Sequence, residues 1–194
     1  MMVADASVWI NLAATGGADW ILKAIPCPVV ITDVALSELE RGRSKGRQAA
    51  HEVTGLISMG LTQVVALDAA DEALFLSLVS GAASETLDDG EAATLAYAER
   101  LGACAVIDER KATNLAARRL PNLEVRATSD LLLRPEVRNT FGEAVLAEAV
   151  FAALTGARMR VPERHVEAIV GLLGDVRAAL CHSLPARFRI VRSG

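Results

Sequence analysis

The chain has 194 residues, of which 52% are apolar and 23% charged, a size and composition that predict one ordinary domain with a short appendage. This composition excludes a disordered tail, a collagen-like repeat and a disulfide scaffold. The formal net charge of −4 gives no overall positive field, so nucleic-acid binding would depend on a local basic patch or on bound metal ions. The three cysteines are far apart and form no C-x-x-C pair, which argues against a zinc ribbon.

The N-terminal segment MMVADASVWINL has no basic region and meets an acid at Asp5, so we expect no signal peptide. No uncharged apolar stretch reaches the roughly 18–20 residues that a membrane span needs, so we expect no membrane span. Together these features predict a reduced, soluble, cytoplasmic protein.

Short apolar segments alternate with helical patterns along most of the chain. The alternation predicts strands at 1–4, 27–31, 61–67, 103–107 and 123–125. It predicts helices from a Ser7 cap through Leu12 and at 33–40, 51–57, 68–79, 92–101 and 112–120, with a basic loop at 41–47. Beyond residue 128 the pattern predicts helices at 141–154 and 162–180, followed by a frayed tail that carries Arg187, Arg189 and Arg192.

Strands that alternate with helices form a parallel sheet covered on both faces. We therefore predict an α/β fold for residues 1–128, namely a three-layer α/β/α sandwich with a central parallel sheet of four to five strands. Residues 129–194 are predicted to form a C-terminal helical extension, whose apolar faces would belong to a core or to a homodimer surface.

Four acids follow strands or begin helices of this array. Asp5 and Asp108 each come directly after a buried strand, Glu38 lies in the helix after the second strand, and Glu91 begins the helix before the fourth strand. Ligands bind outside the carboxyl ends of strands in such sheets, so these carboxylates are expected to converge there. Grouped carboxylates repel one another, and a hard cation such as Mg²⁺ or Mn²⁺ resolves the repulsion. The chemistry this predicts is metal-dependent hydrolysis of a phosphodiester.

Three segments carry a family resemblance: DASVWINL, TDVALSELERG and LDDGEAATLAYAERLGACAVIDERKA. Over about residues 1–128 the chain resembles PIN-domain proteins, of the type found as toxin ribonucleases in toxin–antitoxin pairs. It is most similar to a subgroup with an L-x-x-G-E segment. The resemblance implies a Mg²⁺ or Mn²⁺ site, cleavage of single-stranded RNA, and an antitoxin protein as partner.

Matched by position, the resemblance assigns the metal and the catalysis to Asp5, Glu38, Glu91 and Asp108, with Ser7 supporting Asp5. Two departures stand out. The third acid is Glu91 where toxins mostly have aspartate, and the helical extension is longer than in a minimal toxin.

Several of these residues also have simpler interpretations. Asp5 and Asp108 could be helix caps, Glu38 could form a surface ion pair, and Ser7 could cap its helix alone. Asp89, and with less weight Asp88, competes with Glu91 for the role of third acid. Glu109 could position the metal ligands without binding the ion itself, or it could be a solvated acid of the turn.

Basic residues near the acids are candidates for contacts with RNA phosphates, with a solvated surface as the alternative. They are Arg41, Arg43, Lys45, Arg47, Arg110 and Lys111. Trp9 and Trp20 could stack on bases, although core positions are commoner for tryptophan at helical spacing.

The leading hypothesis is an endoribonuclease, and the second is a PIN-like module that binds RNA or protein without cleaving it. A phosphatase is less favoured, because the first strand ends in D-A-S and not D-x-D. The G-x-G-x-x-G and P-loop motifs are absent from the sequence.

Overall fold

The computed structural model describes residues 1–188, and the tail with Arg189 and Arg192 lies outside the described residues. The chain forms two compact units. The first comprises Met1–Ile10 and Pro26–Arg126, and the second comprises Asn11–Ile25 together with the chain from Ala127 onward. The predicted boundary between 128 and 129 remains a prediction.

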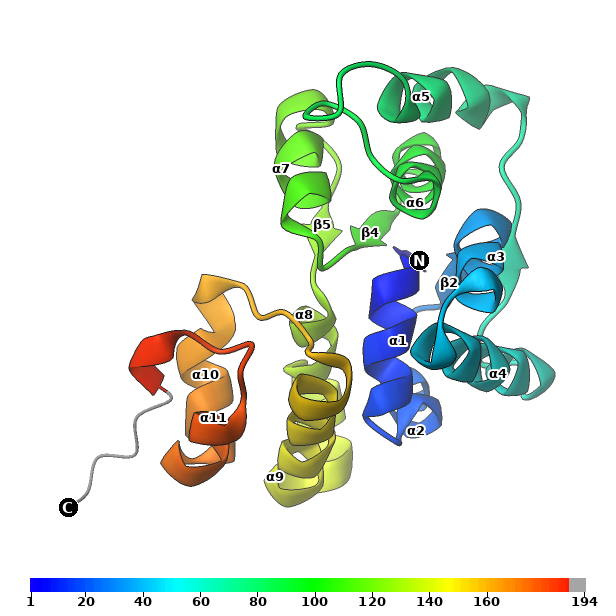
Figure 1. Cartoon of the computed structure of the whole chain (residues 1–194). Helices are drawn as coiled ribbons and strands as arrows, with labels where there is room; N and C mark the ends of the chain where they lie inside the picture. Colours follow the sequence, from blue (N-terminus) through cyan, green and yellow to red (C-terminus); the bar gives the residue numbers. More distant parts are fainter. Residues whose placement is uncertain (189–194) are drawn as a thin grey trace. The chain divides into compact units, whose positions relative to one another are not determined.

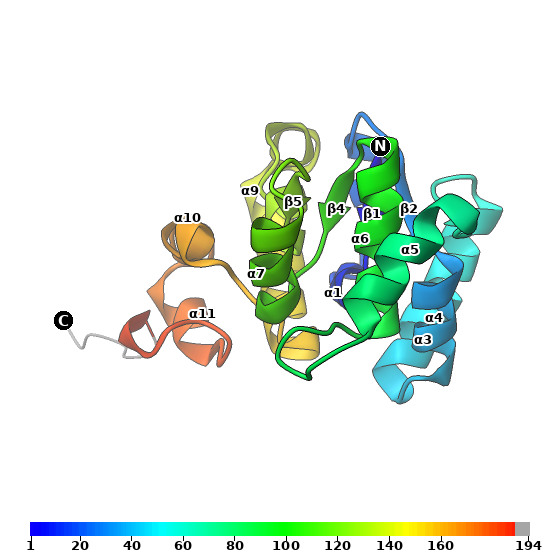
Figure 2. The same ribbon diagram turned by 90° about the horizontal axis from the view of Figure 1, so that it is seen from above.

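The first unit contains a five-stranded, all-parallel sheet in the order β3-β2-β1-β4-β5, with helices on both sides (Figures 1 and 2). This confirms the predicted three-layer α/β/α architecture. The strands are β1 (Met2–Ala4), β2 (Val29–Thr32), β3 (Val64–Val65), β4 (Cys104–Val106) and β5 (Val125–Arg126). The helices are α1 (Ala6–Ala14, which continues into the second unit), α3 (Asp33–Arg41), α4 (Ser44–Ser58), α5 (Ala69–Val79), α6 (Asp89–Leu101) and α7 (Arg110–Arg119).

The strand order reverses at β1, which pairs with β2 on one side and with β4 on the other. Ala4 pairs with Val106, so both strands end at the same edge of the sheet. In parallel α/β sheets the crevice beyond such a reversal is where ligands bind. The topology therefore predicts a ligand site at the carboxyl ends of β1 and β4.

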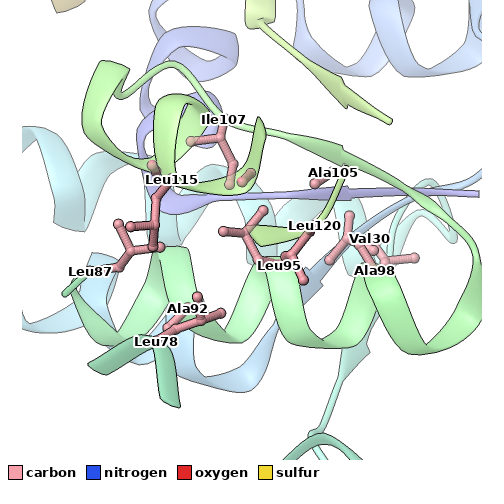
Figure 3. Close-up of a cluster of buried hydrophobic side chains, with 13 residues drawn as sticks. Val30, Leu78, Leu87, Ala92, Leu95, Ala98, Ala105, Ile107, Leu115 and Leu120 are labelled. Atoms are coloured by element: carbon pink, nitrogen blue, oxygen red, sulfur yellow. The ribbon is translucent and has the colours of Figure 1, made fainter. Parts of the chain in front are cut away.

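The core forms because both faces of the short strands are apolar and buried. Val3 and Val30 point to one face, against α6 and its neighbours α5 and α7. Figure 3 shows Leu95 of α6 and Leu115 of α7 gathered with Ile107 in this cluster. Strands with no polar face follow from a sheet that is covered on both sides.

The predicted basic loop at 41–47 is wrong, because most of it is helical. Helix α3 runs to Arg41 and α4 begins at Ser44, so only Gly42 and Arg43 lie between them. Gly46, which favoured a loop in the sequence, is a packing residue. A Cβ at Gly46 would lie 2.9 Å from the carbonyl oxygen of Leu39 in α3. The glycine thus permits the two helices to pack closely.

Other boundaries also differ from the prediction. The strand predicted at 61–67 is reduced to Val64–Val65, and α6 begins three residues earlier than predicted, at Asp89. The single helix predicted at 162–180 is two helices separated by Gly174, whose φ of 74° departs from helical geometry.

The second unit is helical, as predicted for the residues beyond 128. Trp20 packs on Phe141 with ring centroids 4.1 Å apart, which makes it a packing residue of this unit. The elements are α2 (Ala18–Ala24), α8 (Thr128–Leu132), α9 (Pro135–Ala152), a π-helical turn η1 (Ala153–Ala157), α10 (Glu163–Leu173), α11 (Asp175–Leu180) and a 3₁₀ turn η2 (Ala186–Phe188).

By length and composition alone, one segment of the described chain, Pro135–Ala157, could cross a membrane, with a mean hydropathy of 1.3. The sequence analysis expected no such segment. Core helices of soluble proteins pass the same test, so the finding is weak evidence. In addition, the backbone at Gly142 is not helical (φ 76°, ψ 165°), which divides the segment into two shorter helices.

A partly buried polar network joins α8 to α10. His165 Nδ1 lies 2.8 Å from the hydroxyl of the fully buried Ser129, and His165 Nε2 lies 3.2 Å from Asp130 Oδ1. Burial lowers the pKa of His165, which favours the neutral ring. A neutral ring that donates from Nε2 to Asp130 accepts from Ser129 at Nδ1.

We expect His165→Ala to lower the free energy of unfolding by about 1–3 kcal/mol, because it leaves the buried Ser129 hydroxyl without a partner. Arg164→Ala is the matched control, because Arg164 binds the same Asp130 from a side chain that is 55% exposed. An exposed pair contributes under about 1 kcal/mol. Urea unfolding of both variants measures the difference, and equal losses would contradict the network's role.

Candidate functional site

Asp5 lies at the carboxyl end of β1, where its backbone N–H donates to the carbonyl oxygen of Val106 in β4 (3.1 Å). Its backbone carbonyl accepts the first hydrogen bonds of α1, from Val8 and Trp9. The Ser7 hydroxyl and backbone N–H both donate to Asp5 Oδ2, at 2.8 and 3.2 Å. Ser7 thus holds Asp5 in place, and the helix begins at Ala6, before Ser7 could cap it.

The second oxygen of Asp5 is the most unusual polar atom of the site. Asp5 is only 4% exposed, and its Oδ1 is buried with no hydrogen-bond partner within the described residues. Burial raises the pKa of Asp5 to about 6, and the charge of Asp88 adds to the increase. A buried carboxylate oxygen without a donor is costly unless a ligand satisfies it.

Glu38 lies on α3, and its side chain extends toward Asp5 Oδ1. Thr32 is the N-cap of this helix, and its hydroxyl oxygen accepts a hydrogen bond from Ala35 N–H. Burial, and then the charges of Asp88, Asp5 and Asp89, raise the pKa of Glu38 to about 7, against a smaller opposing effect of Arg41. The effect of Asp5 on the pKa of Glu38 shows that two residues 33 positions apart belong to one electrostatic cluster.

The N-terminal turn of α6 provides the remaining residues of this acidic cluster. Asp88 is the N-cap and accepts a hydrogen bond from Glu91 N–H (2.9 Å). A Cβ on Gly90 would lie 2.3 Å from Glu38 Oε2 and 3.3 Å from Asp5 Oδ1. The bare glycine therefore lets both carboxylates approach the helix.

Glu91 is 6% exposed, whereas Asp89 is exposed. Burial, and then the charges of Asp88, Asp5 and Glu109, raise the pKa of Glu91 to about 8. Of the two competing acids, Glu91 is thus the buried one. Asp108 follows β4, is 8% exposed, and lies at the same edge of the sheet as Asp5.

No group of three or more acidic, histidine or cysteine side chains within residues 1–188 is arranged to hold a metal ion as it stands. The structure brings Asp5 and Glu38 together at Gly90 and couples Glu91 to Asp5 electrostatically. Carboxylates that repel one another in the absence of a cation are expected to stand apart.

A pocket with a volume of about 510 Å³ lies beside the cluster. Glu38 is shared between the pocket and the cluster. The pocket is lined by Val34, Glu38, Arg41, Gly42, Asp88 and Asp89.

The other predicted residues take varied positions. Trp9 is 1% exposed, and its indole N–H donates to Ala4 O (3.1 Å), so it is a core residue and cannot stack on bases. Lys111 Nζ donates to the Ala83 carbonyl (2.6 Å), and Glu109 is the N-cap of α7. Arg43 and Arg47 are exposed.

Asp88 is a residue whose part in the site the sequence pattern indicated only weakly, yet its charge raises the pKa values of Asp5, Glu38 and Glu91. The sequence does contain a pattern that indicates the role of Asp88. An aspartate three residues before a glutamate, just ahead of an alanine-rich helix, is the pattern of a helix cap.

We expect Gly90→Ala to reduce the metal-dependent phosphodiester hydrolysis predicted from the sequence about tenfold or more, without destabilising the fold. The new methyl would displace the flexible end of Glu38 from Asp5, and displacements of about 1 Å can cost about a hundredfold in rate. Alanine within a helix is itself favoured over glycine by about 1 kcal/mol. Gly55→Ala in α4 meets nothing within 4 Å and is the control, with unchanged cleavage. Unchanged cleavage in Gly90→Ala, measured beside its melting temperature, would contradict this role.

Comparison with known proteins agrees with the fold. No curated protein matches the chain. A family model described as a PIN domain matches residues 1–175, which extends beyond the predicted limit at 128 and into α11. PIN domains have a nuclease-type fold, are generally hydrolytic nucleases and generally use divalent metals. Because this match covers most of the sequence, the chain belongs to the PIN-domain family.

Proposed function

We propose that the chain is an endoribonuclease that cleaves single-stranded RNA and depends on Mg²⁺ or Mn²⁺. The observation that carries this proposal is Asp5 Oδ1, a buried carboxylate oxygen that has no hydrogen-bond partner within residues 1–188 and lies beside Glu38 at Gly90. A hard cation would satisfy this oxygen and relieve the repulsion that, together with burial, raises the neighbouring pKa values.

The residues that would hold the ion are Asp5, Glu38, Glu91 and Asp108. They fit a hard dication, because all four donate carboxylate oxygens and three of them are at most 8% exposed. When bound, such an ion lowers the pKa of water and stabilises charge on a phosphodiester.

The chain's own residues prepare this centre. Ser7 donates twice to Asp5 Oδ2, which leaves Oδ1 as the oxygen available to a ligand. Asp88 fixes the start of α6 and adds negative charge beside Asp5 and Glu91. Gly90 provides the space in which the Glu38 and Asp5 carboxylates meet.

RNA is the proposed substrate because basic residues lie next to the acidic cluster. Arg41 lines the pocket beside Glu38, and Arg43, Lys45 and Arg47 continue from it onto the first turn of α4. Such residues would hold phosphates on either side of the cleaved bond. Arg110 at the start of α7 is a further candidate.

The finer role proposed is that of the toxin in a toxin–antitoxin pair, acting in the cytoplasm as a homodimer and held inactive by an antitoxin protein. The support for this role is the resemblance of the three sequence segments to toxin ribonucleases. A co-purification test with the product of a neighbouring gene would examine it.

The second candidate is a PIN-like module that binds RNA or a protein without cleaving it. It is favoured by the lack, within residues 1–188, of three acidic, histidine or cysteine groups already arranged to hold a metal. Titration calorimetry with Mn²⁺, run beside RNA cleavage in Mg²⁺ and Mn²⁺, separates the two candidates. Binding of Mn²⁺ with cleavage supports the enzyme, and the absence of both supports the module.

A further inference from the structure

The pocket beside the acidic cluster has a chemical character of its own. Three of its lining residues are acids, namely Glu38, Asp88 and Asp89, and its one base is Arg41. Its volume of about 510 Å³ is within the range of small-molecule sites. Because Glu38 belongs to both the pocket and the cluster, an occupant would lie directly beside the proposed metal centre.

The acids of the pocket differ in how they are engaged. Asp88 uses Oδ1 to cap α6, and Glu38 faces Asp5 across Gly90. Asp89 lies in the first turn of α6 and is exposed, and its side chain forms no hydrogen bond or ion pair within residues 1–188. Its two oxygens are therefore available to a ligand that enters the pocket.

Carboxylates repel the negative charge of phosphate and accept hydrogen bonds from N–H groups. The three acids of the pocket would therefore face a nucleobase and not the RNA backbone. Among the four bases, only guanine presents two adjacent donors, N1–H and the N2 amino group, on its Watson–Crick edge. Adenine, cytosine and uracil each place an acceptor next to a donor there, and that acceptor would face a carboxylate oxygen. A carboxylate with both oxygens available thus selects guanine.

Arg41 provides the complementary group for the phosphate. Its Nε donates to the Ser37 carbonyl (3.1 Å), which anchors the guanidinium at the end of α3. Arg43 and Arg47 follow at the start of α4, a helix with no side-chain cap at its N-terminus. A nucleotide with its base toward Asp89 would have basic residues available for its phosphate.

We propose that this pocket binds a guanosine nucleotide of single-stranded RNA next to the cleaved bond, with Asp89 pairing with the guanine and Arg41 holding its phosphate. The inference rests on the proposed ribonuclease function and adds base specificity to it.

Binding of labelled oligoadenylates, each with one central nucleotide changed, tests the inference. The protein used is the full chain with Asp5→Asn, so that RNA stays intact. Fluorescence polarisation should show about tenfold tighter binding for a central guanosine than for adenosine. Inosine, which lacks the N2 amino group, and N1-methylguanosine should each lose most of this gain.

Two variants test which residue recognises the base and which one binds the phosphate. Asp89→Asn, added to Asp5→Asn, should remove the preference for guanosine, because an amide presents a donor where guanine needs an acceptor. Arg41→Gln should weaken binding of all the oligonucleotides by a similar factor. Glu167→Gln, an exposed change on α10, is the control and should leave both unchanged.

Equal binding of guanosine and adenosine, or a preference that survives Asp89→Asn, would overturn the inference. Cleavage by the unmodified protein is scored separately. Cleavage without base preference overturns the pocket assignment alone, whereas guanosine preference without cleavage in Mg²⁺ or Mn²⁺ overturns the nuclease assignment alone.

Discussion

Replacing Asp5 by asparagine is expected to abolish RNA cleavage and, at the same time, to make the metal-free protein more stable at pH 8. Most mutations of buried polar residues destabilise a protein. Here the charge itself is the unfavourable feature, because burial raises the pKa of Asp5 from 3.8 to about 6. A carboxylate that must ionise in such a place opposes folding by about 3 kcal/mol at pH 8.

Asparagine has nearly the same shape and keeps an oxygen that accepts from Ser7. We expect its melting temperature, without metal, to exceed that of the parent by about 3–10 °C. It should also lose the stabilisation by Mn²⁺ that the parent shows. Asp108→Asn is expected to lose cleavage as well, because Asp108 ends the neighbouring strand.

Differential scanning fluorimetry with EDTA and with Mn²⁺, beside an RNA cleavage assay, provides the measurements. Glu167→Gln removes one exposed carboxylate from α10 and should change neither result. Full activity in Asp5→Asn would remove Asp5 from the mechanism. A lower melting temperature without metal would show that the carboxylate is a structural group held by Ser7 and not a strained ligand.

The sheet edge could be predicted from the sequence because its signals are local. An apolar run that ends in an acid identifies both the strand and the residue that follows it, as at Asp5 and Asp108. The prediction that these acids would be neighbours required β1 to pair with β4, and the two strands do pair. Glu38 and Glu91 followed from their places on the helices next to these strands.

The parts that the sequence did not predict depend on contacts between distant segments. Gly46 favours a loop when read alone, and only the carbonyl oxygen of Leu39 in α3 shows why a helix needs glycine there. Gly90 is similar, because its role appears only when Glu38 and Asp5 lie against it. Whether Asp89 or Glu91 is the buried acid depends on how α6 is rotated, which the exposed fractions show and the spacing does not.

The pH dependence of stability should disappear when metal is added. Raised acid pKa values stabilise the folded state only while the groups hold their protons, so this stability is lost as pH rises through the folded pKa. The relevant groups are Glu38, with its pKa raised from 4.5 to about 7, and Glu91, raised from 4.5 to about 8. His165 has a lowered pKa and acts with the opposite sign, but only below its usual 6.5.

We therefore compare the stability at pH 7 with that at pH 8.5, an interval in which His165 no longer contributes. Without metal, the protein should lose about 1–2 kcal/mol across this interval, mostly through Glu91, and its melting temperature should fall by about 3–6 °C. A bound dication replaces the lost protons, so Mn²⁺ should raise the melting temperature more at pH 8.5 than at pH 7. At a hundredfold excess over the dissociation constant, the stabilisation is about 3 kcal/mol.

Glu91→Gln is the decisive variant, because it removes the group with the highest of these pKa values. Its melting temperature without metal should stay nearly constant from pH 7 to 8.5, and its response to Mn²⁺ should weaken. Glu167→Gln should retain the full pH dependence of the parent. An equal increase with Mn²⁺ at both pH values would mean that the ion binds away from these carboxylates, and the proposed ligand set would then be wrong.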